Sequence, residues 1–316
     1  MVAAIESEGL VKRFGKHEAV AAVDLNVPTG SIYAFLGQNG AGKTTTIRLV
    51  LGLLRPTAGT VRVWGHDVVN ERLAAARGVG SLVETSALYD RLTGRENLDL
   101  TRRMLGAPES EVDRVLEVVD LRDAAGRLAG GYSLGMRQRL GLARAMLGQP
   151  RLLILDEPAN GLDPEGMREM RALIRTLPEQ DGVTVFVSSH LLGEIEQIAT
   201  HVGLMHEGRL LAQSTLAELK GAGERELEVA VVGAERAAAA LSDKGYAARA
   251  SAGGSLRLVM PQDREAASFA ADVNLALVEL GFAVSRLVAA EPTLEDVYLS
   301  MIDARRAPGA RVLQTA

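Results

Sequence analysis

The residues with the clearest chemical use lie in a glycine-rich segment that starts at Gly37. The segment fits the pattern G-x-x-x-x-G-K-[ST]. Glycines allow a tight turn in which several backbone N–H groups point inward and can hold the oxygens of a phosphate. The predicted phosphate-binding residues are Gly37, Gln38, Asn39, Gly40, Ala41, Gly42, Lys43, Thr44 and Thr45.

Two side chains of this loop supply chemistry that the backbone cannot. Lys43 places a positive charge at the β- and γ-phosphates, and Thr44 offers a hydroxyl to Mg²⁺. A glycine-rich turn with a chance lysine is the alternative. The apolar run Ser31–Leu36 before the loop indicates a buried strand, and the helix expected after the loop directs its N-terminus at the same anion. This context favours a nucleotide site.

A second pair of candidate residues follows another apolar run. Leu152–Leu155 is continuous, as is typical of a strand that is buried on both faces. Asp156, at its end, can hold Mg²⁺ through water, and Glu157 is then placed to polarise the water that attacks the γ-phosphate. Acids are common at strand ends, so the pair indicates a catalytic site only in combination with the loop.

The elements that must position these residues follow from the spacing of apolar side chains. Alternation predicts a strand over Val23–Val27, and a helix is expected over Lys43–Leu54. Residues from about 85 to 150 are expected to be mostly helical. A capped helix is predicted over Asp163–Leu177, and Val183–Ser188 predicts another buried strand.

Three further motifs make the pattern specific. Tyr132–Arg139 reads YSLGMRQR and precedes an apolar-striped helix, and Asn160–Asp163 and His190 come later. In this order the motifs resemble those of the ATP-binding-cassette (ABC) ATPases, over residues 5 to about 220. The resemblance implies an α/β fold, a P-loop NTPase with a RecA-like core, an antiparallel β subdomain and a helical insertion. It also implies ATP and Mg²⁺ as ligands and ATP hydrolysis as the reaction, with Lys43 among the catalytic residues.

Single positions take their roles from this resemblance. Phe14 matches the aromatic residue that stacks on adenine, with a buried strand residue as the alternative. Ser133 and Gly135 match the signature that closes on the γ-phosphate of the opposite protomer. Asp163 matches a loop that communicates between protomers, and it also suits a helix cap. His190 matches the switch histidine, which contacts the γ-phosphate and the attacking water.

The chain departs from the family pattern at two places. Leu134 and Met136 replace a glycine and a glutamine of the signature, while Ser133 and Gly135 are kept. Glu84 stands where the family usually has a glutamine, and a similar glutamate occurs in ATPases that resemble those of bacitracin and lantibiotic exporters. We expect Glu84 to bind Mg²⁺ and to link nucleotide state to the helical insertion. A loop acid without metal contact is the alternative.

The chain continues beyond the resemblance to the cassette. A linker is expected near Gly221–Gly223, so the nucleotide-binding domain is assigned to 1–220. The pattern over 221–305 is βαββαβ plus a helix, which predicts a ferredoxin-like accessory domain, and 306–316 is expected to be a loose tail. The segment Glu291–Leu299 resembles the C-terminal part of daunorubicin-resistance ATPases, in which this domain is thought to support dimerisation or regulation.

Composition excludes several other classes of protein. The chain has 316 residues, no cysteine, 3% aromatic residues and a net charge of -5. Disulfides and a cysteine-ligated zinc site are excluded, and the charge and the few aromatics argue against a nucleic-acid partner. No run approaches the ~20 apolar residues of a spanning helix, and no signal peptide is recognised. We therefore expect a cytoplasmic protein, and the resemblance to ABC ATPases implies a peripheral position on the cytoplasmic face of a bacterial-type membrane.

A chain with one phosphate loop and one signature needs a second copy, itself or a paralogue, to complete two sites. The resemblance to exporter ATPases implies the ATPase subunit of an exporter of a drug, antibiotic or antimicrobial peptide, which drives separate transmembrane permease subunits. Leu88–Leu98 is expected to help dock them. A soluble mechanoenzyme that acts on nucleic acid or ribosomes is the alternative, although the chain lacks the long coiled-coil arms typical of that class.

Overall fold

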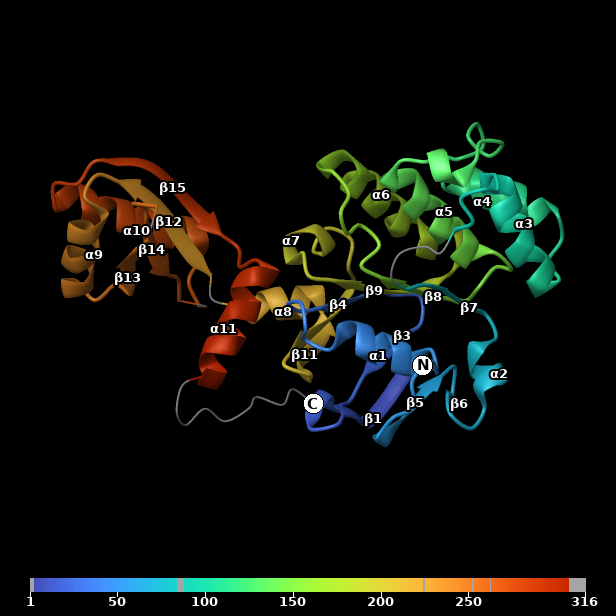
Figure 1. The fold of residues 1–316 in the computed structure, drawn as a ribbon. Helices are drawn as coiled ribbons and strands as arrows, with labels where there is room; N and C mark the ends of the chain where they lie inside the picture. Colours follow the sequence, from blue (N-terminus) through green and yellow to red (C-terminus); the bar gives the residue numbers. More distant parts are fainter. Residues whose placement is uncertain (1–2, 84–87, 224, 252, 262, 307–316) are drawn as a thin grey trace. The chain divides into compact units, whose positions relative to one another are not determined.

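The computed structural model describes residues 3–306 except 84–87, 224, 252 and 262. These residues divide into two compact units, one that ends at Leu216 and one that starts at Ala217 (Figure 1). Within the described ranges, no helix combines the length and the apolar character needed to cross a membrane.

The first unit is built on a six-stranded sheet in the order β11-β10-β4-β9-β8-β7, which is parallel except for β11. Its strands are β4 (Ile32–Leu36), β7 (Val79–Leu82), β8 (Leu152–Asp156), β9 (Thr184–Ser189), β10 (His201–His206) and β11 (Arg209–Thr215). The strands β4, β8 and β9 are buried along their whole length, as their continuous apolar sequences predict. Their adjacent carboxyl ends bring Gly37, Asp156 and His190 to one edge of the sheet.

A second, antiparallel sheet lies on the other side of helix α1 (Lys43–Val50). Its strands are β1 (Ala3–Phe14), β2 (His17–Val23), β3 (Asn26–Pro28), β5 (Ala58–Val63) and β6 (His66–Asp67). Ile47 and Leu49 of α1 are fully buried in one core with residues of both sheets. The helix that follows the phosphate loop is therefore held from two sides.

Three expected boundaries differ from the structure, and hydrogen bonds account for the first two. The strand expected over Val23–Val27 is interrupted, because the Leu25 N–H donates to Ser7 and Asp24 accepts from the Gly9 N–H. Helix α1 ends at Val50 instead of Leu54. The backbone turns at Gly52, which has a φ of 65°, so that the next two N–H groups fold back onto the Arg48 carbonyl.

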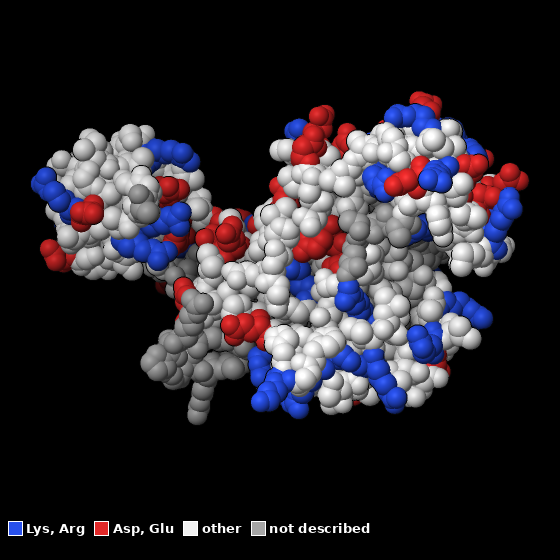
Figure 2. All heavy atoms as spheres, in the orientation of Figure 1, with Lys and Arg blue, Asp and Glu red and all other residues white. Residues whose placement is uncertain are grey.

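The insertion is mostly helical over its described residues, which confirms the expectation. Its helices are α3 (Gly94–Leu105), α4 (Ser110–Val118) and α5 (Leu134–Met146), with a short 3₁₀ turn at Ala129–Gly131. Buried Glu111 accepts hydrogen bonds from Arg114, Gln149 and the Gly148 N–H, which ties α4 to the end of α5. The hydrogen bond from Arg114 holds the pKa of this carboxyl below its usual value. Side chains of both charges are interspersed over α3 and α4 (Figure 2).

The remaining helices of the first unit are α2 (Arg72–Ala76), α6 (Pro164–Asp181), α7 (Leu192–Ile195) and the start of α8 (Leu216–Gly221). Helix α6 covers the sheet beside β9. It begins as expected, with Asp163 as its N-cap and proline at its first position, but it ends at Asp181 instead of Leu177.

The second unit contains a four-stranded antiparallel sheet in the order β13-β14-β12-β15. Its elements are β12 (Glu226–Val231), α9 (Ala234–Asp243), β13 (Ala248–Ala250), β14 (Leu256–Val259), α10 (Ala266–Glu279), β15 (Val284–Ala290) and α11 (Leu294–Arg306). The helices α9 and α10 pack on one face of the sheet around Leu227, Leu241 and Phe269. The expected order of strands and helices is confirmed.

Close packing at Gly80 provides a test of how α5 is held on the central sheet. Gly80 lies in β7, and a Cβ there would overlap the Ala145 carbonyl oxygen of α5. We expect Gly80→Ala to lower the free energy of unfolding of the first unit by about 1–3 kcal/mol, because backbone must move. Urea unfolding measures this. Gly126→Ala is the control, since its Cβ would meet open space, and an equal loss in both variants would contradict the expectation.

Candidate functional site

The glycine-rich loop lies between β4 and α1, where the backbone leaves no room for larger residues. Gly42 has a φ of 102°, and a Cβ there would lie 2.5 Å from the Ala19 carbonyl oxygen. A Cβ at Gly37 would overlap the Met205 carbonyl oxygen. The neighbouring strands therefore require glycine at both positions, and at Gly42 the backbone angle requires it as well.

Lys43 is buried, although its ammonium group is charged. Its Nζ donates to the Gly37 carbonyl at 2.6 Å and lies 3.2 Å from Oε1 of Glu157. A buried ammonium requires such partners, because the loss of its hydration is costly. Phosphate oxygens that enter the loop must replace or share these contacts.

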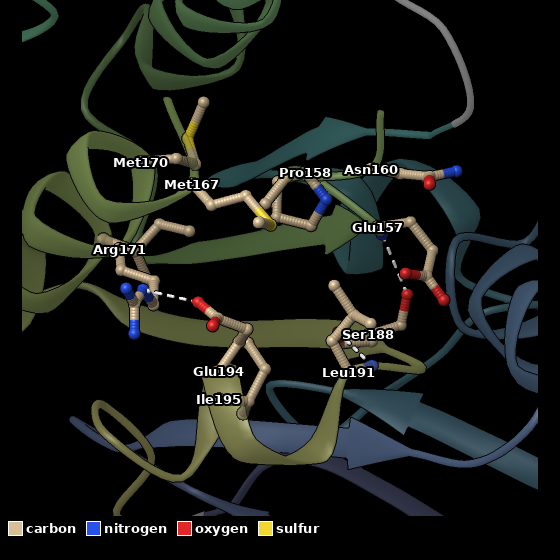
Figure 3. A pocket seen from close by; sticks show the side chains of 13 residues that line it. Glu157, Pro158, Asn160, Met167, Met170, Arg171, Ser188, Leu191, Glu194 and Ile195 are labelled. Carbon is tan, nitrogen blue, oxygen red and sulfur yellow. Dashed lines mark hydrogen bonds and ion pairs between the residues drawn. The ribbon is translucent and has the colours of Figure 1, made fainter. Parts of the chain in front are cut away.

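Glu157 follows the last residue of β8 and has a φ of 51°, in the left-handed region that side chains other than glycine rarely adopt. Ser188 holds the backbone in place, because its Oγ donates to Asp156 at 2.6 Å. The same Oγ accepts from the Glu157 N–H at 3.0 Å, a contact that Figure 3 shows. Such local strain is typical of functional sites, where the surrounding structure maintains it.

The Glu157 carboxylate also contacts the predicted switch histidine. Nδ1 of His190 lies 2.8 Å from Oε2, while Lys43 lies beside Oε1. One carboxylate thus joins residues from three elements that are far apart in sequence: the phosphate loop, the end of β8 and the end of β9. The structure brings all three predicted catalytic residues together.

A cleft of about 380 Å³ opens in front of this group. It is lined by Asn39, Gly40, Gly42, Lys43, Thr44 and Thr45 of the loop, by Glu157, and by Phe14, His17 and Ala19 of the β1–β2 hairpin. Phe14 is 49% exposed, so the alternative that it is a buried strand residue is wrong. Its ring is accessible at the cleft, as a stacking platform for a base must be.

Sequence reasoning missed two residues around Phe14. Nζ of Lys12 lies 5.2 Å from the Phe14 ring centroid and donates to the Arg55 carbonyl at 2.8 Å, so that the ammonium is held over the ring. His17 pairs with Phe14 across the hairpin. The signal for Lys12 was present, because residues two apart in a strand share a face.

The signature residues lie outside this cleft. Ser133 and Gly135 are not among the described residues that line it, and Ser133 is exposed at the start of α5, where its Oγ accepts from the Met136 N–H. A Cβ at Gly161 would lie 3.3 Å from the Leu134 side chain, so the signature adjoins the loop that ends at Asp163. Asp163 accepts from the Gly166 N–H, and its role as a helix cap is confirmed.

The described residues fit a Mg²⁺ ion that is bound partly by the protein and partly by the phosphates of the substrate. No group of three or more His, Cys, Asp or Glu collects within them to hold a metal alone. Thr44 at the cleft and Asp156 beside Glu157 instead offer one hydroxyl and one carboxylate. Mg²⁺ commonly binds through one or two carboxylates plus substrate phosphates and water. Glu84, the third expected ligand, lies outside the described residues.

Residues 20–160 match the sequence model of the ABC transporter family. The chain belongs to this family as an ATP-binding subunit, and it hydrolyses ATP. It is 39% identical over 301 residues to the bacitracin transport ATP-binding protein BcrA of Bacillus licheniformis, which covers 94% of this chain and 97% of the relative. It is 36% identical to the daunorubicin resistance ATP-binding protein DrrA3 of Streptomyces coeruleorubidus, over 94% and 95% of the two chains.

The fold is similar to that of a solved dimeric cassette, MJ0796, bound to ADP and Pi. The TM-score is 0.60 at 24% identity, and the match covers 67% of this chain and 98% of that one. The likeness concerns the fold of the first unit, since the shared length corresponds to one cassette.

Phe14 allows a direct test of nucleotide recognition. We expect Phe14→Ala to weaken ATP and ADP binding alike by about tenfold or more, because stacking of a base on an aromatic ring contributes ~1–3 kcal/mol. Titration calorimetry measures both affinities. Phe14→Tyr, which keeps the ring, should bind as the unchanged protein does, and wild-type affinity in Phe14→Ala would exclude the stacking role.

Proposed function

We propose that this chain is the ATP-hydrolysing subunit of an exporter and that it acts as a nucleotide-dependent dimer on separate transmembrane permease subunits. The observation that carries the proposal is the Glu157 carboxylate, held between Lys43 and His190 beside the phosphate loop. The proposed location is the cytoplasmic face of a bacterial membrane. The similar proteins BcrA and DrrA3 both come from bacteria, which supports this location.

The proposed roles follow from the positions of the side chains. Lys43 exchanges its contacts with Gly37 and Glu157 for oxygens of the β- and γ-phosphates. Glu157, released from the lysine, accepts a proton from the water that attacks the γ-phosphate in line, and His190 keeps the carboxylate oriented. Thr44 and Asp156 would hold Mg²⁺, which when bound supplies positive charge to the phosphate oxygens.

In a dimer, residues of the partner subunit would complete the nucleotide site. Ser133 and Leu134, at the start of α5, are exposed and do not line the cleft of their own chain. A hydroxyl and a helix N-terminus can bind the γ-phosphate of a partner's ATP. We propose that Ser133, Gly135 and the Asp163 loop face the partner subunit, which is a second copy or a paralogue. The dimeric state of the solved cassette with the same fold supports the proposal that two subunits associate.

The proposed cargo is an antimicrobial peptide or an amphiphilic drug. Two relatives that match the chain over nearly its full length are named for bacitracin transport and for daunorubicin resistance. Both support an exporter over a mechanoenzyme that acts on nucleic acid or ribosomes. The net charge of -5 and the mixed charges over the insertion in Figure 2 point in the same direction.

We propose that an apolar groove of the first unit receives a cytoplasmic helix of the permease. The groove has a volume of about 560 Å³ and is lined by residues of α1, α2 and β7. Leu73 is 89% exposed at the groove, and Leu53 is 62% exposed. Glu84 follows β7 in the sequence, two residues after Leu82, and we propose that it binds Mg²⁺ and links nucleotide state to the helical insertion. The segment Leu88–Leu98 is proposed to extend the docking surface.

The proposed domains are the cassette over 1–220 and an accessory domain over 221–305. The strand order β13-β14-β12-β15 with two helices on one face supports a ferredoxin-like arrangement for the latter. Thr293 accepts from the Asp296 N–H and so caps α11. Support of dimerisation or regulation is the proposed role of this domain.

Substitution of Glu157 tests the proposed mechanism. We expect Glu157→Gln to abolish turnover while the variant still binds ATP, so that a dimer accumulates with ATP but not with ADP. Light scattering coupled to size exclusion measures the mass. Ser133→Arg, added to Glu157→Gln, should keep the protein monomeric with ATP. Hydrolysis at the wild-type rate in Glu157→Gln would show that another residue is the base.

The docking groove can be tested separately from hydrolysis. We expect Leu73→Glu to abolish co-purification with a co-expressed transmembrane permease subunit, because a charge in an apolar interface is not solvated. ATP binding should remain, since Leu73 does not line the cleft. Val232→Glu, at a site in the second unit that is also largely exposed, is the control. Undiminished co-purification of Leu73→Glu would place the permease elsewhere.

A further inference from the structure

A second, much smaller cavity lies behind Glu157, and Figure 3 shows the side chains around it. Its volume is about 20 Å³, so the side chains on its two sides are almost in contact. Met167, Met170 and Arg171 reach it from α6, and Glu194 and Ile195 reach it from α7. Glu157 lines both this cavity and the nucleotide cleft. The cavity therefore lies where α6, α7 and the catalytic carboxylate meet.

An ion pair joins the two helices across this space. Nε of Arg171 lies 3.0 Å from Oε2 of Glu194, and their side chains are 12% and 35% exposed. Among the described residues, Glu194 is the one acidic partner of Arg171. Nε and Nη1 of Arg171 and Oε2 of Glu194 are buried and make no hydrogen bond, so the contact is an ion pair without hydrogen-bond geometry. A guanidinium that has lost most of its hydration depends on such a partner. The position of Glu194 is thus coupled to that of α6.

The two helices that are joined in this way begin beside functional residues. Helix α6 starts directly after the loop that ends at Asp163, and Arg171 lies two turns further along. Helix α7 has only four residues, starts two residues after His190 and has no side-chain N-cap. A helix of one turn is not stable by itself, so burial of Ile195 and the pair with Arg171 must hold it.

We propose that Arg171 is a positioning residue for ATP hydrolysis. Through Glu194 it fixes α7, and through α7 it holds the His190 imidazole against the Glu157 carboxylate. Because Arg171 is carried by α6, a displacement of the loop before α6 on contact with a partner subunit changes the geometry at His190. This inference rests on the proposed roles of Glu157 and His190 and adds a connection within one subunit between the dimer-facing loop and the catalytic base.

The proposal predicts a loss of turnover without a loss of nucleotide binding. In Arg171→Met, which keeps the length of the side chain, we expect kcat for ATP hydrolysis to fall about 10- to 100-fold, because small displacements of a catalytic group have effects of this size. KM and the affinity for ATP should stay within about twofold, since Lys43 and the loop are untouched. Arg168→Met is the matched control, because Arg168 is exposed on the same helix.

Exchange of the charges of Arg171 and Glu194 distinguishes a positioning role of the ion pair from a general effect on protein stability. We expect the double variant Arg171→Glu/Glu194→Arg to recover most of kcat, whereas each single reversal does not. Thermal unfolding is measured on all variants, and a midpoint that follows kcat would indicate a purely structural ion pair and overturn the proposal. Unchanged kcat in Arg171→Met, or a double variant no better than the singles, would also overturn it. If Arg171→Met does not fold, Glu194→Gln at the more exposed partner provides the same measurement.

Glu157→Gln, assayed in parallel, distinguishes this inference from the proposed function. If Glu157→Gln is inactive and Arg171→Met is fully active, the base is correctly assigned and only the positioning role fails. If Glu157→Gln turns over ATP normally, the proposed mechanism fails, and a positioning role that acts through Glu157 fails with it.

Discussion

The sharing of one carboxylate by a buried lysine and a histidine is the constraint on which the rest of the first unit depends. Glu157 can contact both Lys43 and His190 only if β4, β8 and β9 are neighbours and end at the same edge of the sheet. The parallel order of these strands satisfies this requirement. The left-handed backbone at Glu157, held by Ser188, then turns the side chain toward the loop. The main features of the fold thus serve the placement of a single acidic group.

The surroundings of the loop show how local sequence and tertiary packing act together. Glycine at position 42 is required by its backbone angle and also by the Ala19 carbonyl of a different sheet. Helix α1, which starts at this loop, is buried between the two sheets through Ile47 and Leu49. The phosphate site is consequently part of the core, and its geometry is maintained by the packing of the whole unit.

Motifs of short range could be predicted from the sequence, and longer-range contacts could not. The loop, the buried strands and the helix cap at Asp163 each depend on residues within a few positions of one another. The break at Leu25 and the end of α1 depend on hydrogen bonds to Ser7 and around Gly52, which alternation of apolar residues does not encode. Pairs such as Asp90–Arg137 and Arg171–Glu194 join distant segments without any periodic signal.

The separation of the signature from the cleft has a consequence for the cell. In the proposed arrangement each chain holds two incomplete halves of a site, and neither half can cleave ATP well without a second chain. Free subunits meet at a rate that falls with the square of their concentration, whereas two subunits bound to one permease are permanent neighbours. Newly made subunits that have not yet reached the membrane would then leave the ATP pool almost untouched, and consumption would begin with assembly.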